Sequence, residues 1–318
     1  MNHFLDLLRA KWHQPAWRHS TFVTLLAAVS AALAVPHMWT VQPEVLPDVV
    51  ISATERVGEI PVEVAAKTAA TTPGRHMGFD TNVYPGDKAM QAWKESAEYE
   101  WVGYYLPAPC HKDNSWAGKR DRLVAMGWGM AVIYVGQQTW GRTPRPTSKA
   151  AQRAGRTGAS CNADFVSAGR GTIDGDDAVA KAAADGFPRG TVIFLDVERM
   201  ETMPQAMRDY YKAWAARVLA DGRYRPGVYV HAHNATDVHD DLKQVFAAAS
   251  NTEEPTVWVA SGHNFSRDKA PTDVGKTFAD VWQGMLDIVE SNGGVKLPID
   301  VNVAAVPSPS DQYAITAD

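Results

Sequence analysis

The chain has 318 residues, of which 45% are hydrophobic and 21% charged, and its formal net charge is −5. This composition is that of an ordinary globular protein with enough apolar material for a large core. The mildly acidic total lacks the basic footprint of a nucleic-acid-binding protein, so we expect no nucleic-acid partner.

Residues 1–41 predict export. A basic stretch of twenty residues precedes an uncharged apolar run, Thr21 to Val35, which is the pattern of a signal peptide. The "ALA" at 32–34 fits a cleavage site, whereas the run read on to Val41 approaches the roughly 20 residues that cross a bilayer. A cleaved signal peptide and an anchor in the inner (cytoplasmic) membrane both stay open. Both place the rest of the chain in the periplasm or outside the cell.

The remaining chain divides into three parts by its hydrophobic pattern and residue composition. Residues 42–74 show no sustained hydrophobic period and end in small polar residues, which indicates a linker. Residues 75–312 carry the recurring strand and helix patterns of a folded domain, and 313–318 form a short tail.

The two cysteines, Cys110 and Cys161, lie in loop-like sequence. In an exported protein they are candidates for a disulfide, which would close a loop of about 50 residues and contribute roughly 4 kcal/mol. Two unpaired thiols are the alternative. Neither cysteine has a second one within a few residues, so a zinc motif is not indicated.

Eight strand-like runs recur through the folded domain. They are Met77–Asn82, Trp101–Leu106, Met130–Gly136, Thr191–Glu198, Gly227–His233, Thr256–Ser261, Ala279–Gln283 and Pro298–Ala304.

Helix-period segments separate several of these runs. They cover residues 87–97, 176–186, 203–222 and 235–250, and Gly186 and Gly222 stand where helices would end. Strands that alternate with helices predict an α/β fold with parallel strands, and eight such runs predict a single (β/α)8 TIM-like barrel. An open doubly wound sheet is the alternative, although no Gly-rich phosphate loop follows the first strand.

Polar side chains gather at the ends of the predicted strands. Asp196 and Glu198 share one face at the end of the fourth strand, because side chains alternate along a strand. The same test selects Asp80 with Asn82, Tyr229 with His231 and His233, Asp280 with Trp282, and Asp300 with Asn302. Barrels of this kind place their active sites at these strand ends. For Asp280 alone, capping of a following helix is the simpler interpretation.

Carboxylates that lie close together repel one another and destabilise the fold. Their clustering therefore indicates a functional role. An acid that protonates a leaving oxygen beside an anion that stabilises an oxocarbenium-like centre suits glycoside hydrolysis. We assign the acid to Glu198, which is outermost, and the stabilising role to Asp196 and Asp80. The residues expected to bind substrate are Asn82, Tyr229, His231, Trp258, Trp282, Gln283, Asp300 and Asn302. This hypothesis needs no cofactor and no metal.

A metal-dependent hydrolase is a competing hypothesis. His231 and His233 share a strand face, and Asp196, Glu198 and His263 lie at neighbouring strand ends, which together offer enough nitrogen and oxygen ligands. His233 lies at the strand exit, however, and its motif contains no acidic ligand.

The segment Thr139 to Cys161 contains five basic residues and no acid. It is most simply a solvated loop, and over the mouth of a barrel it could meet an anionic polymer or a membrane surface.

Seven segments in order carry a family resemblance: "GFDTNVYP", "GWGMAVIYVGQQ", "TVIFLDVE", "YRPGVYVHA", "VWVAS", "VWQ" and "IDVNVA". From about Arg75 to Val306 the chain resembles the bacterial glycoside-hydrolase-like domain family of unknown function. That family looks like a relative of the family 25 muramidases, lysozymes with a (β/α)8-like barrel.

The resemblance implies muramidase roles at the matching positions. The strand-one aspartate falls on Asp80, the Asp-x-Glu pair on Asp196 and Glu198, and the last-strand aspartate on Asp300. Glu198 would be the proton donor. The first muramidase motif continues Asp-x-Ser-x-x-Gln, whereas here the residues from Asp80 are Asp-Thr-Asn-Val-Tyr-Pro.

The sequence therefore favours an exported glycosidase-like barrel that acts on cell-wall polysaccharide, above all peptidoglycan. A barrel that binds envelope polysaccharide without cleaving it is the alternative from another class.

Overall fold

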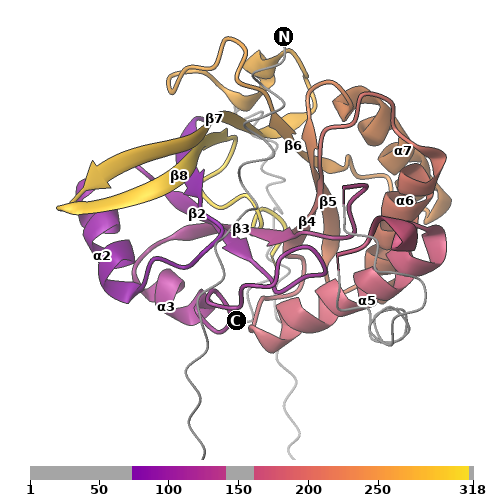
Figure 1. The fold of residues 1–318 in the computed structure, drawn as a ribbon, viewed down its shortest axis with the longest axis horizontal. Helices are drawn as coiled ribbons and strands as arrows, with labels where there is room; N and C mark the ends of the chain where they lie inside the picture. The colour runs from indigo at the N-terminus through magenta and orange to yellow at the C-terminus, as the bar shows by residue number, and fades with distance from the viewer. Residues whose placement is uncertain (1–73, 141–160, 315–318) are drawn as a thin grey trace, which may run out of the picture. The chain divides into compact units, whose positions relative to one another are not determined.

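Eight strands close into one barrel in chain order (Figure 1). The computed structural model describes residues 74–140 and 161–314. The strands are β1 (His76–Asp80), β2 (Trp101–Tyr105), β3 (Gly129–Tyr134), β4 (Val192–Val197), β5 (Arg225–His231), β6 (Thr256–Ala260), β7 (Ala279–Asn292) and β8 (Val295–Ala304). The predicted TIM-like α/β barrel is confirmed.

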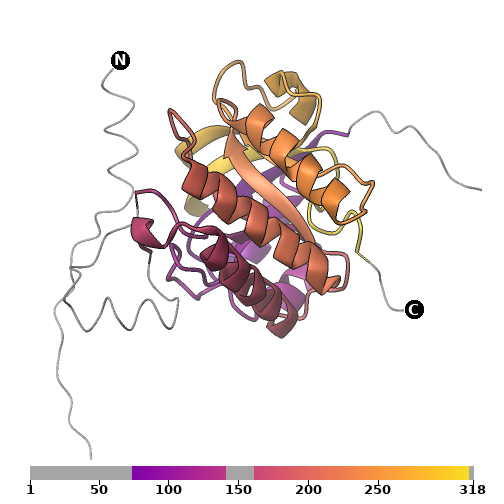
Figure 2. The same ribbon diagram turned by 90° about the vertical axis from the view of Figure 1, so that its right-hand side faces the viewer.

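Helices lie outside the barrel. They are α2 (Asp87–Ser96), α3 (Arg120–Ala125), α5 (Ala168–Ala184), α6 (Gln205–Asp221) and α7 (Ala235–Ala248), with short 3-10 turns η1 (Ala163–Phe165) and η2 (Pro271–Val274). Figure 2 shows α5, α6 and α7 side by side on one flank. The predicted end of a helix at Gly222 is confirmed, because this residue caps α6 in the left-handed conformation.

Helix α5 begins two turns earlier than its sequence pattern indicates. Glycines at 169, 171 and 175 make this stretch resemble a loop, but two of them serve helix packing. A Cβ on Gly171 would lie 2.2 Å from the backbone oxygen of Tyr210, and one on Gly175 would lie 3.0 Å from the Arg217 side chain. The missing side chains let α5 approach α6 closely.

The last two strands differ most from prediction. We expected short parallel strands, but β7 and β8 are 14 and 10 residues long and form an antiparallel hairpin. Its turn is Gly293-Gly294, whose φ angles of 56° and 76° suit glycine. β8 is also antiparallel to β1. The start of β8, rather than its end, therefore reaches the edge of the barrel where β1 to β6 finish.

Aromatic side chains fill the interior of the barrel. Trp101 and Trp258 are fully buried and meet edge to face, with ring centroids 5.6 Å apart. Gly78 makes room for them, because a Cβ there would lie 2.0 Å from the Trp101 ring. The barrel is thus a packed core, and any site must lie above it at the mouth.

The predicted disulfide between Cys110 and Cys161 is present. It ties the loop after β2 to the segment that precedes α5.

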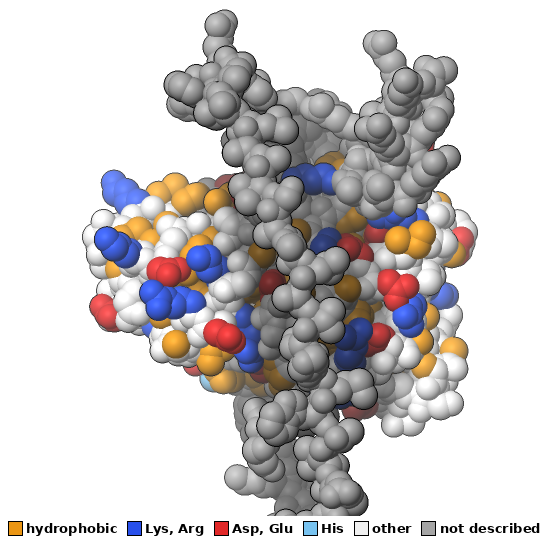
Figure 3. All heavy atoms as spheres, turned by 90° about the horizontal axis from the view of Figure 1, so that it is seen from below, with side chains coloured by type: hydrophobic (Ala, Val, Ile, Leu, Met, Phe, Trp, Pro, Cys, Tyr) orange, Lys and Arg blue, Asp and Glu red, His pale blue; other side chains and the backbone are white. Residues whose placement is uncertain are grey.

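The predictions for residues 1–73 and most of the basic segment fall outside the described residues. Within the described ranges no helix is both long and apolar enough to cross a membrane. The face in Figure 3 shows Lys and Arg intermingled with Asp and Glu, rather than a broad field of one sign.

Candidate functional site

Three of the four strands expected to bring a carboxylate to the barrel mouth do so. Asp80 is the last residue of β1, and the antiparallel register places Asp300 of β8 directly opposite it. Asp196 is the penultimate residue of β4, and Glu198 follows its end. The antiparallel course of β8 is what puts Asp300 at the mouth; in a parallel strand it would lie deeper in the barrel.

Asp80 is a buried carboxylate whose two oxygens are both engaged. Oδ1 accepts from the Tyr105 hydroxyl at 2.6 Å. Oδ2 accepts from Gln283 Nε2 at 2.9 Å and from Asn302 Nδ2 at 3.0 Å. The side chain is 4% exposed, and these three donors hold it in place.

Gln283 connects the carboxylates of β1 and β8 to β5. Its Nε2 donates to Asp80 and, at 3.4 Å, to Asp300 Oδ2, while its Oε1 accepts from the Tyr229 hydroxyl at 2.7 Å. The backbone N–H of Asp287 donates to Asp300 Oδ1 at 2.7 Å. Asp80, Asp300, Gln283 and Tyr229 therefore belong to one continuous hydrogen-bonded cluster.

Burial and the carboxylates of the cluster raise the pKa values of two tyrosine hydroxyls. Burial, and then the charges of Glu198, Asp196, Asp300 and Asp80, raise the pKa of Tyr229 well above its usual range. Burial together with Asp80, Asp300 and Asp196 does the same to the pKa of Tyr105. Four carboxylates thus act on one small volume, and both tyrosines remain neutral donors.

The β4 acids differ from Asp80 in accessibility. Asp196 and Glu198 are half-buried, so solvent and a ligand can reach them. Gln138, which follows β3, donates through Nε2 to the backbone oxygen of Asp196 at 2.8 Å. This bond fixes the end of β4 from the neighbouring strand.

The predicted aromatic ligands Trp258 and Trp282 are fully buried. Trp258 Nε1 donates to Asn302 Oδ1 at 3.1 Å, so it supports the amide that holds Asp80. Trp282 neighbours Gln283 and therefore faces the other side of β7, where it packs on Phe265 and donates to the Ser261 carbonyl at 2.7 Å. Neither ring is at a surface that a sugar could stack on.

Asn82 and the histidines lie nearer the surface. Asn82 is exposed in a bend two residues after β1 ends, so it does not continue the face of Asp80. His231 ends β5, and burial lowers the pKa of its ring. His233 is exposed, and its Nε2 bonds to the Glu201 carbonyl at 3.0 Å. Substrate contacts by Asn82, Tyr229 and His231 stay predictions.

Asp280 is a correction. It is the second residue of β7, at the opposite end of the barrel, and its Oδ2 accepts from the Val257 N–H at 2.8 Å. It neither joins the mouth nor caps a helix. Burial raises its pKa to about 6.

No group of three or more His, Cys, Asp or Glu side chains in the described ranges is arranged to hold a metal ion. His233 in particular is bonded to a loop carbonyl. The arrangement therefore gives no support to the metal-dependent hypothesis.

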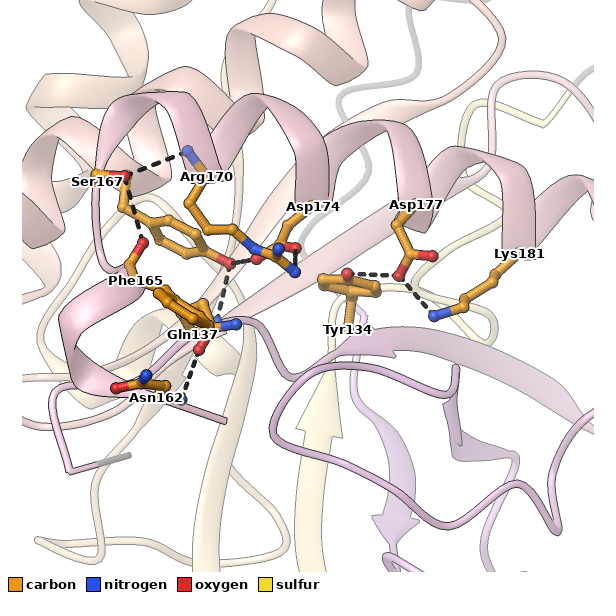
Figure 4. A network of polar contacts seen from close by, with 10 residues as sticks. Tyr134, Gln137, Asn162, Phe165, Ser167, Arg170, Asp174, Asp177 and Lys181 are labelled. Atoms are coloured by element: carbon orange, nitrogen blue, oxygen red, sulfur yellow. Dashed lines mark hydrogen bonds and ion pairs between the residues drawn. The ribbon is translucent and has the colours of Figure 1, made fainter. Parts of the chain in front are cut away.

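A buried polar network includes Gln137, the residue before Gln138 (Figure 4). Arg170 Nη2 pairs with Asp174 Oδ1 at 2.5 Å, and the Tyr210 hydroxyl donates to Asp174 Oδ2 at 2.7 Å. The same hydroxyl accepts from the Gln137 N–H at 2.9 Å, and Gln137 Oε1 accepts from the Asn162 N–H at 2.8 Å. Helices α5 and α6 thereby fix the segment that carries Gln138.

The sequence pattern did not select Tyr105 or Gln138. It selected Gln283, but not as the residue that connects the carboxylates. Tyr105 and Gln138 do lie at or just after strand ends, where a search for polar side chains of every kind would have found them. Their partners could not be read from the sequence, because they depend on which strands face each other across the mouth.

Residues 91–304 match the model of the Rv2525c-like, glycoside hydrolase-like domain. The chain belongs to this family. Among proteins with curated functions, none matches the sequence.

Several solved structures are similar at low identity. An uncharacterized protein of B. stearothermophilus is 17% identical over 72% of this chain and 95% of its own, with a TM-score of 0.48. The spore cortex lytic enzyme SleM of Clostridium perfringens is 14% identical over 76% and 69%, with a TM-score of 0.47. The Tat-secreted protein Rv2525c of Mycobacterium tuberculosis is 16% identical over 73% and 95%, with a TM-score of 0.40.

Proposed function

We propose that this protein is an exported glycoside hydrolase that cleaves cell-envelope glycan, in particular peptidoglycan, with Glu198 as the general acid. The observation that carries the proposal is that Asp80, Asp300, Asp196 and Glu198 lie at or just beyond strand ends on one side of the barrel, where, after burial, their charges all raise the pKa of Tyr229. A cluster of acids at the mouth of a barrel costs stability, so its retention supports a catalytic use.

The contacts divide the work among the acids. Asp80 accepts three hydrogen bonds inside the barrel, which suits a permanent negative charge beneath an oxocarbenium-like centre. Glu198 lies beyond the end of β4 with the longer side chain and is half-buried, so it can reach the leaving oxygen of a bound glycan. To Asp196, whose backbone oxygen accepts from Gln138, we assign the orientation of the substrate or the stabilisation of charge.

Export rests on residues 1–41, with 42–74 as the linker to the barrel. Under this assignment the disulfide forms in an oxidising compartment.

The test uses the purified full-length chain with purified peptidoglycan. New reducing ends in the soluble products, identified by mass spectrometry, are expected from the wild type and not from Glu198→Gln. Glu201→Gln is the matched control: the same change three residues later, at an exposed side chain paired with Arg199.

Sedimentation with the insoluble glycan separates the outcomes. We expect Glu198→Gln to sediment as the wild type does. If no variant releases product but all sediment with the glycan, the barrel is a binding module and the hydrolase assignment is wrong.

A further inference from the structure

The β7–β8 hairpin extends outward from the site. We call its residues Val289, Ser291, Lys296 and Pro298 the lip. β8 pairs continuously with β1 from Asp300 to Ala304 and with β7 from Val295 to Ile299, so alternate side chains of β8 share a face. Asn302 and Asp300, which point into the site, therefore share a face with Pro298 and Lys296. The register pairs Val289 with Pro298, and Ser291 with Lys296, across the hairpin.

The opposite face of the hairpin is occupied. Leu297 and Ile299 are buried, and the Val295 carbonyl accepts from Trp93 Nε1 of α2 at 3.0 Å. Glu290 accepts from the Tyr99 hydroxyl at 2.8 Å and pairs with Arg267. Figure 1 shows the two strands running out past the barrel beside α2. The opposite face of the hairpin thus packs against the rest of the protein, and the face that carries Asp300 is exposed.

The bend that produces the lip lies next to the site. The register of β7 shifts between Gln283 and Met285 and again between Met285 and Ile288. Asp287, within the second shift, has a φ of 53° and donates its N–H to Asp300. The base of the lip and the catalytic cluster are therefore a single rigid unit.

The open face combines apolar surface with one positive charge. Val289 is 67% exposed, and Pro298 is exposed beside it. Lys296 is exposed and forms no ion pair with another described side chain. The mouth is lined by negatively charged carboxylates, whereas Lys296 is positively charged and lies outside the mouth.

We infer that the lip, defined as Val289, Ser291, Lys296 and Pro298, binds the peptide of a peptide-substituted glycan whose sugar chain lies in the mouth. The inference rests on the proposed function. A glycan stripped of peptide offers hydroxyls, acetamides and a lactyl carboxylate held close to each muramic acid ring. A peptide adds alkyl side chains for Val289 and Pro298, and carboxylates farther from the sugar for Lys296. Continuity with Asp300 puts this surface within reach of a substituent on the same chain.

The test measures binding of the full-length protein to two soluble probes. One is a peptidoglycan chain fragment with its peptides, and the other is the same fragment after an amidase has removed them. We expect the wild type to bind the peptide-bearing probe more tightly. Lys296→Gln should weaken that binding about threefold, and Lys296→Gln with Val289→Ser about tenfold, with the peptide-free probe unaffected.

Lys88→Gln is the matched control, because it removes an exposed lysine from α2 and should change neither affinity. Equal affinity of the wild type for both probes, with cleavage intact, would overturn the lip assignment and leave the proposed function standing. Binding to neither probe would overturn both. Loss of liposome binding rather than of peptide selectivity in Val289→Ser would assign the lip to a lipid surface instead.

Discussion

Asp80 is a buried acid and Asp280 a half-buried acid, and they lie at opposite ends of the barrel. Asp80 ends its strand and is surrounded by three donors, whereas Asp280 begins its strand and accepts from one backbone N–H. With so little compensation, burial raises the Asp280 pKa from 3.8 to about 6.

This pKa predicts how stability depends on pH. Below 3.8 the folded and unfolded chains both carry the Asp280 proton. As pH rises from 3.8 to about 6 only the unfolded chain releases it, so the free energy of unfolding falls through this window and stays lower above it. The loss at pH 7 is about 3 kcal/mol.

Asp280→Asn should therefore stabilise the protein at neutral pH, because its amide oxygen can still accept from Val257. A cavity of about 460 Å³ beside residue 280 leaves room for the amide nitrogen. Urea unfolding of both proteins at pH 4 and pH 7 checks this: the variant should gain up to about 3 kcal/mol at pH 7 and little at pH 4. A stability difference between variant and wild type that does not grow from pH 4 to pH 7 would contradict the assignment.

The sequence predicts Asp80, Asp196, Glu198 and Asp300 at strand ends, together with the amides Gln283 and Asn302, but not the hydrogen bonds among them. Asp300 reaches the mouth only because β8 is antiparallel, which strand alternation does not predict. Tyr105 and Gln283 matter because their partners lie on other strands, and a single sequence does not give cross-strand register. For the same reason Trp282 was assigned to the site although its side chain faces away from it.

At the scale of elements, the buried network of Figure 4 joins two helices to the end of β3. Tyr210→Phe would leave the Gln137 N–H without its acceptor and Asp174 Oδ2 without its donor, both away from water. We expect a loss of about 2–3 kcal/mol in the free energy of unfolding, measured by urea titration. Activity should fall as well, since Gln138 depends on this segment.

Tyr134→Phe is the control for that variant. Its hydroxyl donates at 2.7 Å to Asp177, whose side chain is 40% exposed, so water can replace the lost bond. It should cost about 1 kcal/mol or less and leave activity unchanged. Equal losses in the two variants would show that the network does not act as a unit.

Element types and the parallel course of β1 to β7 were predictable from the sequence, and the direction of β8 was not. Alternation of strand and helix patterns gave the barrel, because that pattern dictates parallel crossovers. The same rule misled for β8, where Gly293-Gly294 makes a two-residue hairpin in place of a crossover. The predicted helix was shorter than α5 because Gly171 and Gly175 made the start of α5 resemble a loop. In the structure these glycines allow α5 to pack closely against α6.

At the scale of the whole molecule, the Cys110–Cys161 bridge spans 51 positions of the chain. In the chain-entropy model such a link stabilises by about 4 kcal/mol. Replacing both cysteines by Ser should lower the free energy of unfolding by an amount of this order, and reducing agent should destabilise only the wild type. A double variant as stable as the oxidised wild type would contradict a structural role for the bridge.

The account depends most directly on Glu198. The rate of reducing-end release from peptidoglycan should be measured side by side for the wild type, Glu198→Gln and Glu201→Gln, with folding verified by thermal unfolding. We predict that Glu198→Gln loses ~10²–10⁴-fold in rate while Glu201→Gln stays within about twofold of the wild type. Equal rates for wild type and Glu198→Gln would show that Glu198 is not the acid and would contradict the account.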